Sequence, residues 1–217
     1  MIPVADIEVA SSFPAGLPMG LPAEDEVDEE GYGFFRDVWD VGHVSHEEAV
    51  AMLDEERHLV SLADHATRTH TEFEAVAKAL ETRDAEYLPA GFASLHAGSK
   101  IMEIANADDE DGTSLGALEL GVAGLTYVLT SIGCFTAASC RSHCSESSWS
   151  DRPVIFFAAE RSTVEWLTPL VQETGCGFDD GSERGAHLLV VEAPSITNFM
   201  DLADRILKKI KPPPRDV

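Results

Sequence analysis

One continuous apolar run limits the folds open to this chain more than any other feature. Residues 153–159 read Pro-Val-Ile-Phe-Phe-Ala-Ala and lie between Arg152 and Glu160. A short run with β-branched and aromatic residues predicts a strand, and the lack of polar alternation predicts that both of its faces are covered. Such a strand requires neighbouring strands beside it and helices packed over it.

Two further strands are expected, one before this run and one after it. Residues 134–139 and 186–192 have the short apolar pattern of strands, and helical periodicity lies between and beyond the strand segments. The sequence therefore predicts an α/β or α+β fold. It would contain a small layered sheet, with strands near 134–139, 153–159 and 186–192, and packed helices.

Capping sequences mark where helices are expected to begin. Ser45 and Glu48 have the spacing of a capping box, and Ser162 and Glu165 repeat it. Ser195 precedes an amphipathic stripe that ends in lysines and prolines, as a final helix would. The segment opened by Ser45 fits either two antiparallel helices or one long bent helix.

Charge and composition divide the chain into three expected regions. The 217 residues carry a net charge of −24, and residues 1–112 carry −20 of it. We expect a disordered acidic tail over 1–31, a helical region with an acidic loop over 32–112, and an α/β layer domain over 113–217. The tail is rich in Pro, Gly and acids, so it cannot bury enough apolar area to offset its ordering entropy. An aromatic segment follows that we expect to dock on the domain or on a partner: Tyr32, Phe34, Phe35, Val38 and Trp39.

The negative charge also restricts the partners and the location of the protein. A field of this sign repels phosphate backbones, so the sequence disfavours nucleic acid as a partner. The most apolar stretch, 115–132, contains Glu119 and three glycines, which favours a buried helix over a membrane span. The first twenty residues lack a basic region, and the four cysteines are therefore expected as reduced thiols. We expect a soluble cytoplasmic protein with no membrane partner; the sequence assigns neither cofactor nor oligomeric state.

The loop between the first two expected strands is the candidate ligand-binding site. Residues 139–152 are polar and rich in hydroxyls, and ligands often gather at strand ends. Arg141 and Arg152 either present an anion site or are paired with internal acids such as Asp151 and Glu146. If the loop is functional, its side chains converge on one concave surface walled by a tryptophan. The predicted ligand-binding residues are Ser139, Cys140, Arg141, His143, Trp149, Asp151 and Arg152.

These residues favour a binding module over an enzyme. We predict that the loop binds a small anionic ligand or a basic protein partner. The alternative is an S-adenosylmethionine-dependent or Cys-dependent enzyme that uses the same loop, with Cys140 activated by His143 or Arg141. The sequence has no P-loop, no dinucleotide-binding glycine motif and no Gly-x-Ser-x-Gly, so nucleotide hydrolysis, dinucleotide redox chemistry and serine hydrolysis lose support.

A zinc site is a further alternative for the same region. Structural zinc sites usually take paired ligands at short spacing from two separated segments. The chain has no Cys-x-x-Cys, and a fourth ligand is not evident, so the sequence assigns no metal ligand. The residues weighed for zinc are Cys134, Cys140, His143, Cys144, Cys176 and His187.

The end of the first expected strand resembles a known family. Residues 135–140, Phe-Thr-Ala-Ala-Ser-Cys, follow a helix and precede an apolar strand. They resemble a segment of the tRNA wybutosine-synthesis methyltransferase family, whose strand end reads aromatic-Thr-x-Ser-Ser-Cys and is soon followed by Gly-Arg. Ser139 and Cys140 match, Ala138 replaces a serine, and Ser-His stands in place of Gly-Arg. The resemblance covers roughly 118–192 in element order, and it implies an S-adenosylmethionine-dependent enzyme acting on a modified guanosine in tRNA.

Overall fold

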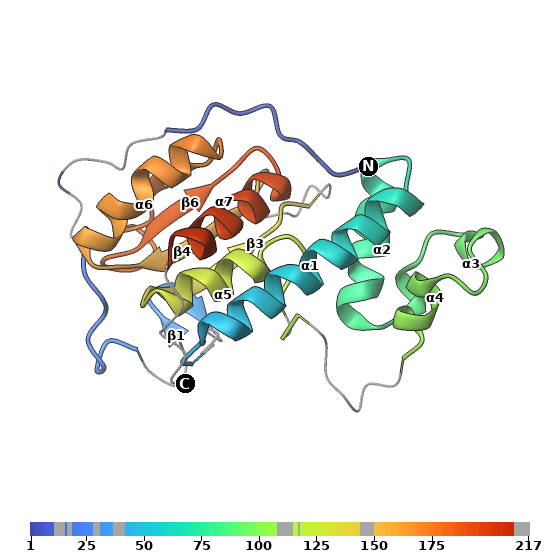
Figure 1. Cartoon of the computed structure of the whole chain (residues 1–217), viewed down its shortest axis with the longest axis horizontal. Coiled ribbons are helices and arrows are strands. Elements are labelled where there is room, and N and C mark those ends of the chain that lie inside the picture. The colour runs from blue at the N-terminus through green and yellow to red at the C-terminus, as the bar shows by residue number, and fades with distance from the viewer. Residues whose placement is uncertain are drawn as a thin grey trace, which may run out of the picture.

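The computed structural model describes residues 1–10, 16, 19–27, 31–36, 42–107, 115–116, 118–143 and 150–210. Within these residues, a four-stranded antiparallel sheet has helices on one face and a short hairpin on the other (Figure 1). The predicted fold class is therefore confirmed: a small layered sheet with packed helices. The sheet has the order β3-β4-β6-β5 and consists of β3 (Phe135–Cys140), β4 (Val154–Ala158), β5 (Gly177–Asp180) and β6 (Leu189–Glu192).

Strand β4 lies inside the sheet and is buried along its whole length. Ile155 and Phe157 belong to the main core under the helices, whereas Phe156 faces the opposite side. There it packs against the hairpin of β1 (Gly31–Tyr32) and β2 (Phe35–Arg36), and the ring centroids of Phe35 and Phe156 are 4.9 Å apart. Both faces are thus covered, as the apolar run predicted.

The hairpin also confirms part of the prediction for the aromatic segment. Tyr32 is buried and Phe35 packs on the sheet, so these two residues dock on the domain. Phe34 is 77% exposed and does not dock. Val38 and Trp39 lie outside the described residues.

The helices form one hydrophobic core with the sheet. Residues of the helical region, such as Leu59 and Phe73, share this core with Phe157 and Phe199 of the C-terminal half. None of the helices in the described part of the chain has the length and apolar content needed to cross a membrane. The longer helices are α1 (His46–Ala66), α2 (His70–Thr82), α5 (Ala123–Ser131), α6 (Arg161–Glu173) and α7 (Ile196–Lys209). The shorter elements are a 3-10 turn (Ala85–Tyr87), α3 (Phe92–Leu95) and α4 (Lys100–Ala105).

Capping explains most of the helix boundaries. The predicted capping boxes at Ser45 and Ser195 are both present, and α1 and α2 are separate helices because Thr69 caps the second one. The predicted start at Ser162 is wrong: α6 begins at Arg161, with Glu160 as its N-cap and no side-chain cap hydrogen bond. The apolar helix expected across 115–132 is shorter in the structure and spans α5 alone.

The strand predictions need three corrections. Strand β5 was missed because it is short and half of its residues, Asp179 and Asp180, are exposed acids. Strand β6 is shorter than the predicted 186–192, since His187 has a φ of 68° and the Leu188 amide donates to the Gly185 carbonyl in a turn. The strand predicted near 134–139 lies one residue further on.

The first ten residues differ from the expectation of a disordered tail. They run along the outside of the domain (Figure 1, blue) and are held there by backbone hydrogen bonds. The Ala5 amide donates to the Pro194 carbonyl at 2.8 Å, and the Phe178 amide donates to the Ala10 carbonyl at 2.7 Å. The physical reason is that backbone pairing with the domain adds to partial apolar burial, since Ile2 packs against the main core. Much of the rest of the expected tail lies outside the described residues.

Candidate metal centre

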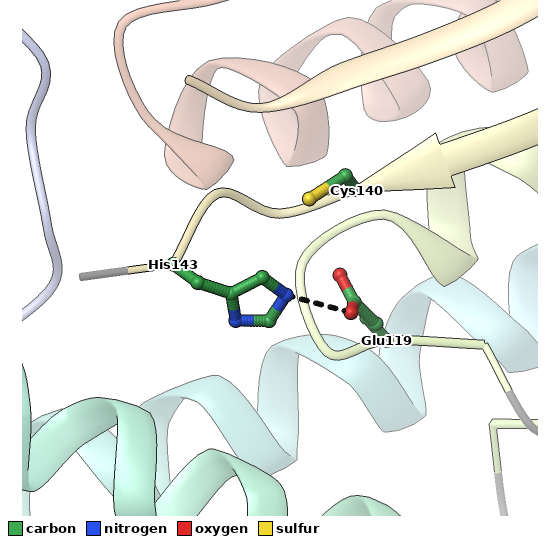
Figure 2. Close-up of side chains that lie close together, drawn as sticks. All are labelled: Glu119, Cys140 and His143. Carbon is green, nitrogen blue, oxygen red and sulfur yellow. Dashed lines mark hydrogen bonds and ion pairs between the residues drawn. The ribbon is translucent and has the colours of Figure 1, made fainter. Parts of the chain in front are cut away.

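Three side chains from two segments of the chain converge beside the end of β3. Glu119 lies in the loop before α5, Cys140 ends β3, and His143 follows three residues later. Each offers one potential ligand atom, and these atoms all lie within 4.8 Å of one another. Figure 2 shows the three side chains pointing toward one another, with Nε2 of His143 2.9 Å from Oε1 of Glu119.

The local backbone brings Cys140 and His143 together. Cys140 pairs with Val154 of β4 and is fully buried, so its position is fixed by the sheet. Ser142 then adopts a φ of 77°, an uncommon value for a non-glycine residue, where the chain leaves the strand. Its amide donates to Sγ of Cys140 at 3.4 Å.

His143 lies between two carboxylates. Its Nδ1 is 3.0 Å from Oε1 of Glu74 on α2, and its Nε2 faces Glu119. Hydrogen bonding raises the pKa of His143 to about 10, with Cys140 as the larger cause and Glu119 as the second. Without a metal ion, the ring is therefore a charged imidazolium that donates to both carboxylates.

Arg141 holds the segments that carry these side chains. Its guanidinium is buried and pairs with the carboxylate of Glu81 on α2. Glu81 also accepts a hydrogen bond from the Leu120 amide at 2.6 Å, and the Arg141 amide donates to Oε2 of Glu119 at 2.8 Å. Arg141 therefore connects α2, the loop before α5 and the end of β3.

Arg152 is also paired with internal acids. Its Nε lies 2.9 Å from Oε2 of Glu192 and 3.7 Å from Oδ1 of Asp151. Burial raises the pKa of Glu192, and the charge of Arg152 opposes this shift. Both arginines are thus paired with internal carboxylates. This is the alternative to an anion-binding role for the two side chains.

The predicted site residues are not gathered on one concave surface in the part of the chain that is described. Arg141 and His143 line a cavity of about 220 Å³, whereas Arg152 lines another of about 460 Å³, and Asp151 borders both. Ser139 lies within β3 opposite Ile155. Trp149 and the acid Glu146 lie outside the described residues, so the wall predicted for the site is not observed there.

Only two of the residues weighed for zinc come together among those that the structure describes. Cys140 and His143 come together, while Cys134 and Cys176 lie in the main core, where burial raises the pKa of each thiol to about 12. His187 lies in the turn before β6, and Cys144 lies outside the described residues. Glu119 was not among the residues weighed for zinc, although an acid inside the most apolar stretch of the sequence was a signal for a specific role.

Comparisons of the chain with protein-family models, with curated proteins and with solved structures found no match. The resemblance to the wybutosine-synthesis methyltransferases therefore stays a prediction. The predicted binding of an anion or a basic partner through the 139–152 loop stays one as well.

Proposed function

We propose that the protein binds one zinc ion through Cys140, His143 and Glu119. The observation that carries this proposal is the convergence of a sulfur, an imidazole nitrogen and a carboxylate oxygen within 4.8 Å. These are the donor types that bind zinc, and neighbouring ligand atoms in a tetrahedral zinc site lie about 3.5 Å apart. Nε2 of His143 and Oε1 of Glu119 now lie 2.9 Å apart, so the three side chains would have to rotate to reach this spacing around an ion.

The surroundings of His143 support the same assignment. A histidine that binds metal through one nitrogen usually donates its other N–H to a carboxylate or carbonyl, which fixes the orientation of the ring. Glu74 lies 3.0 Å from Nδ1 and supplies this partner. When zinc binds, Nε2 loses its proton to become a ligand, and Nδ1–H remains directed at Glu74.

Charge balance also favours a divalent cation at this place. A Cys140 thiolate and the Glu119 carboxylate each carry one negative charge, and Cys140 is fully buried. Without a metal ion, the His143 imidazolium compensates the Glu119 carboxylate. When Cys140 and His143 lose their protons to become ligands, a divalent ion neutralises both anionic ligands at once. Three protein ligands are the number that leaves a fourth position for water or a bound molecule.

The proposal is tested by measuring zinc binding to the purified chain by equilibrium dialysis and calorimetry. We expect one zinc ion per chain. Cys140→Ser and Glu119→Gln should each weaken binding by more than about hundredfold, because loss of a ligand exceeds the effect of losing an orienting partner. The matched control is Cys176→Ala, which removes another buried thiol and should leave the affinity unchanged.

Circular dichroism shows whether each variant is still folded, so that weaker zinc binding can be assigned to the missing ligand and not to unfolding. A folded Cys140→Ser variant that binds zinc as tightly as the unmodified chain would overturn the proposal. So would the failure of the unmodified chain to bind zinc at one ion per molecule.

A further inference from the structure

The N-terminal segment forms one wall of the cavity beside His143. Pro3, Val4 and Ala5 line this cavity of about 220 Å³, opposite residues of α2 that include Glu74. In Figure 2 the pale blue N-terminal segment lies on the side of His143 away from Glu119. An ion or chelator that approaches through this cavity would therefore reach the metal centre at its His143 side.

Individual hydrogen bonds and one ion pair hold this wall in place. The Met1 ammonium lies 2.9 Å from Oδ1 of Asp64 and donates to Oγ1 of Thr67 at 2.7 Å. The Ile2 amide donates to Oδ1 of Asp64 at 3.0 Å, the Ala5 amide donates to the Pro194 carbonyl, and Oγ of Ser195 donates to the Pro3 carbonyl at 3.0 Å. Val4 is 66% exposed, and residues 1–10 contain no helix or strand. Segments held by individual hydrogen bonds outside helices and sheets open at lower free energy than the core.

We propose that residues 1–10 are a strap that closes the cavity beside His143 and sets the rate of metal exchange at the centre. The inference rests on the zinc site proposed above. When the strap opens, the His143 side of the site becomes accessible; when it closes, the cavity wall is restored. Because the strap contributes no ligand, it changes the rates of zinc entry and release equally and leaves the equilibrium affinity unchanged.

The test measures how fast a chromophoric chelator removes zinc from the loaded full-length protein. Asp64→Ala removes the acceptor of the Ile2 amide, and Ala5→Pro removes the donor to Pro194. The double variant should release zinc roughly tenfold faster, because two hydrogen bonds and the ion pair between Asp64 and the Met1 ammonium are lost from the closed state. Asp54→Ala is the matched control, since Asp54 is an exposed acid of the same helix, about 15 Å away along its axis.

The outcomes separate the strap from the zinc site. Faster release with an unchanged dissociation constant supports the strap, provided that the Asp54→Ala control behaves as the unmodified chain. Equal release rates in a zinc-binding protein would overturn the strap and leave the zinc site standing. A weakened dissociation constant in the double variant would also overturn it, because the strap would then be part of the site. Absence of zinc binding in the unmodified chain would overturn both proposals.

Discussion

Arg141 and Glu81 form a buried ion pair at the point where three segments of the fold meet. Their side chains are 3% and 7% exposed, and the Glu81 oxygen that faces the guanidinium also accepts from the Leu120 amide. The pair therefore ties α2 both to the loop that carries Glu119 and to the end of β3. The geometry of the candidate metal centre depends on this connection.

Removing one member of the pair should destabilise the protein strongly. We expect Arg141→Ala to lower the free energy of unfolding by about 3–5 kcal/mol, because the Glu81 carboxylate is left buried without its partner. Urea unfolding measures the change. Replacing both residues by apolar ones, as in Arg141→Met with Glu81→Leu, should recover part of the loss, because no charge is left buried but the Leu120 amide loses its acceptor.

An exposed ion pair supplies the control for this prediction. Arg205 lies 3.0 Å from Glu173, with both side chains about half exposed. Arg205→Ala should cost about 1 kcal/mol or less. An Arg141→Ala variant no less stable than Arg205→Ala would show that the buried pair does not hold the segments together.

Because of Glu56, the free energy of unfolding should decrease as the pH rises from acidic to neutral. Its carboxylate is buried at the start of α5, where Oε1 accepts from the Gly121 amide at 2.9 Å. Burial raises its pKa from 4.5 to about 7, against the opposing effect of the amides of Gly121, Ala123 and Gly124. The folded chain therefore keeps a proton that the unfolded chain loses above its own pKa. The stabilisation that this proton provides is fully present below pH 4.5 and is lost as the pH rises through about 7. The free energy of unfolding should decrease by up to about 3 kcal/mol over this range.

The contribution of Glu56 is isolated by comparing variants over this pH range. Urea unfolding from pH 4.5 to 8 should give a flatter profile for Glu56→Gln than for the unmodified chain. Glu47→Gln changes an exposed residue of the same helix and should keep the original slope. Parallel profiles for Glu56→Gln and the unmodified chain would contradict the assignment.

The fold was largely predictable from the sequence because its signals are local. The apolar run of β4 and the capping residues Ser45 and Ser195 each determine structure within a few positions. Strand β5 was not predictable in this way, since the pairing of Phe178 with Val191 on β6, and not its own composition, makes it a strand. The ordering of the first ten residues likewise depends on backbone partners elsewhere in the chain, such as Pro194.

The candidate site was predicted only in part, for the same reason. Cys140 and His143 are close in sequence, so their pairing was one of the possibilities considered. Glu74 and Glu119 reach His143 from α2 and from the loop before α5, across 69 and 24 positions of sequence. The spacing of residues in one segment carries no information about such contacts. Nor did it show that Glu81 neutralises Arg141.

Glu74 should act on zinc affinity without being a ligand. Glu74→Gln leaves the three ligands in place but removes the carboxylate that orients His143 through Nδ1. We expect zinc binding to weaken by about 10–100-fold, the usual effect of losing such a partner. Asp151 borders the same cavity, and Asp151→Asn should have little effect on the zinc affinity. Competition against a chelator of known affinity gives both values, and equal affinities for the two variants would contradict the role of Glu74.

The absorption spectrum of the cobalt-loaded protein tests the central claim most directly. Co²⁺ occupies tetrahedral zinc sites, and a thiolate ligand gives it a near-ultraviolet charge-transfer band. The account predicts this band at one Co²⁺ per chain in the unmodified protein and in Cys176→Ala, and its loss in folded Cys140→Ser. A chain that binds no cobalt, or a Cys140→Ser variant that keeps the band, would contradict the assignment of Cys140, His143 and Glu119 as a metal centre.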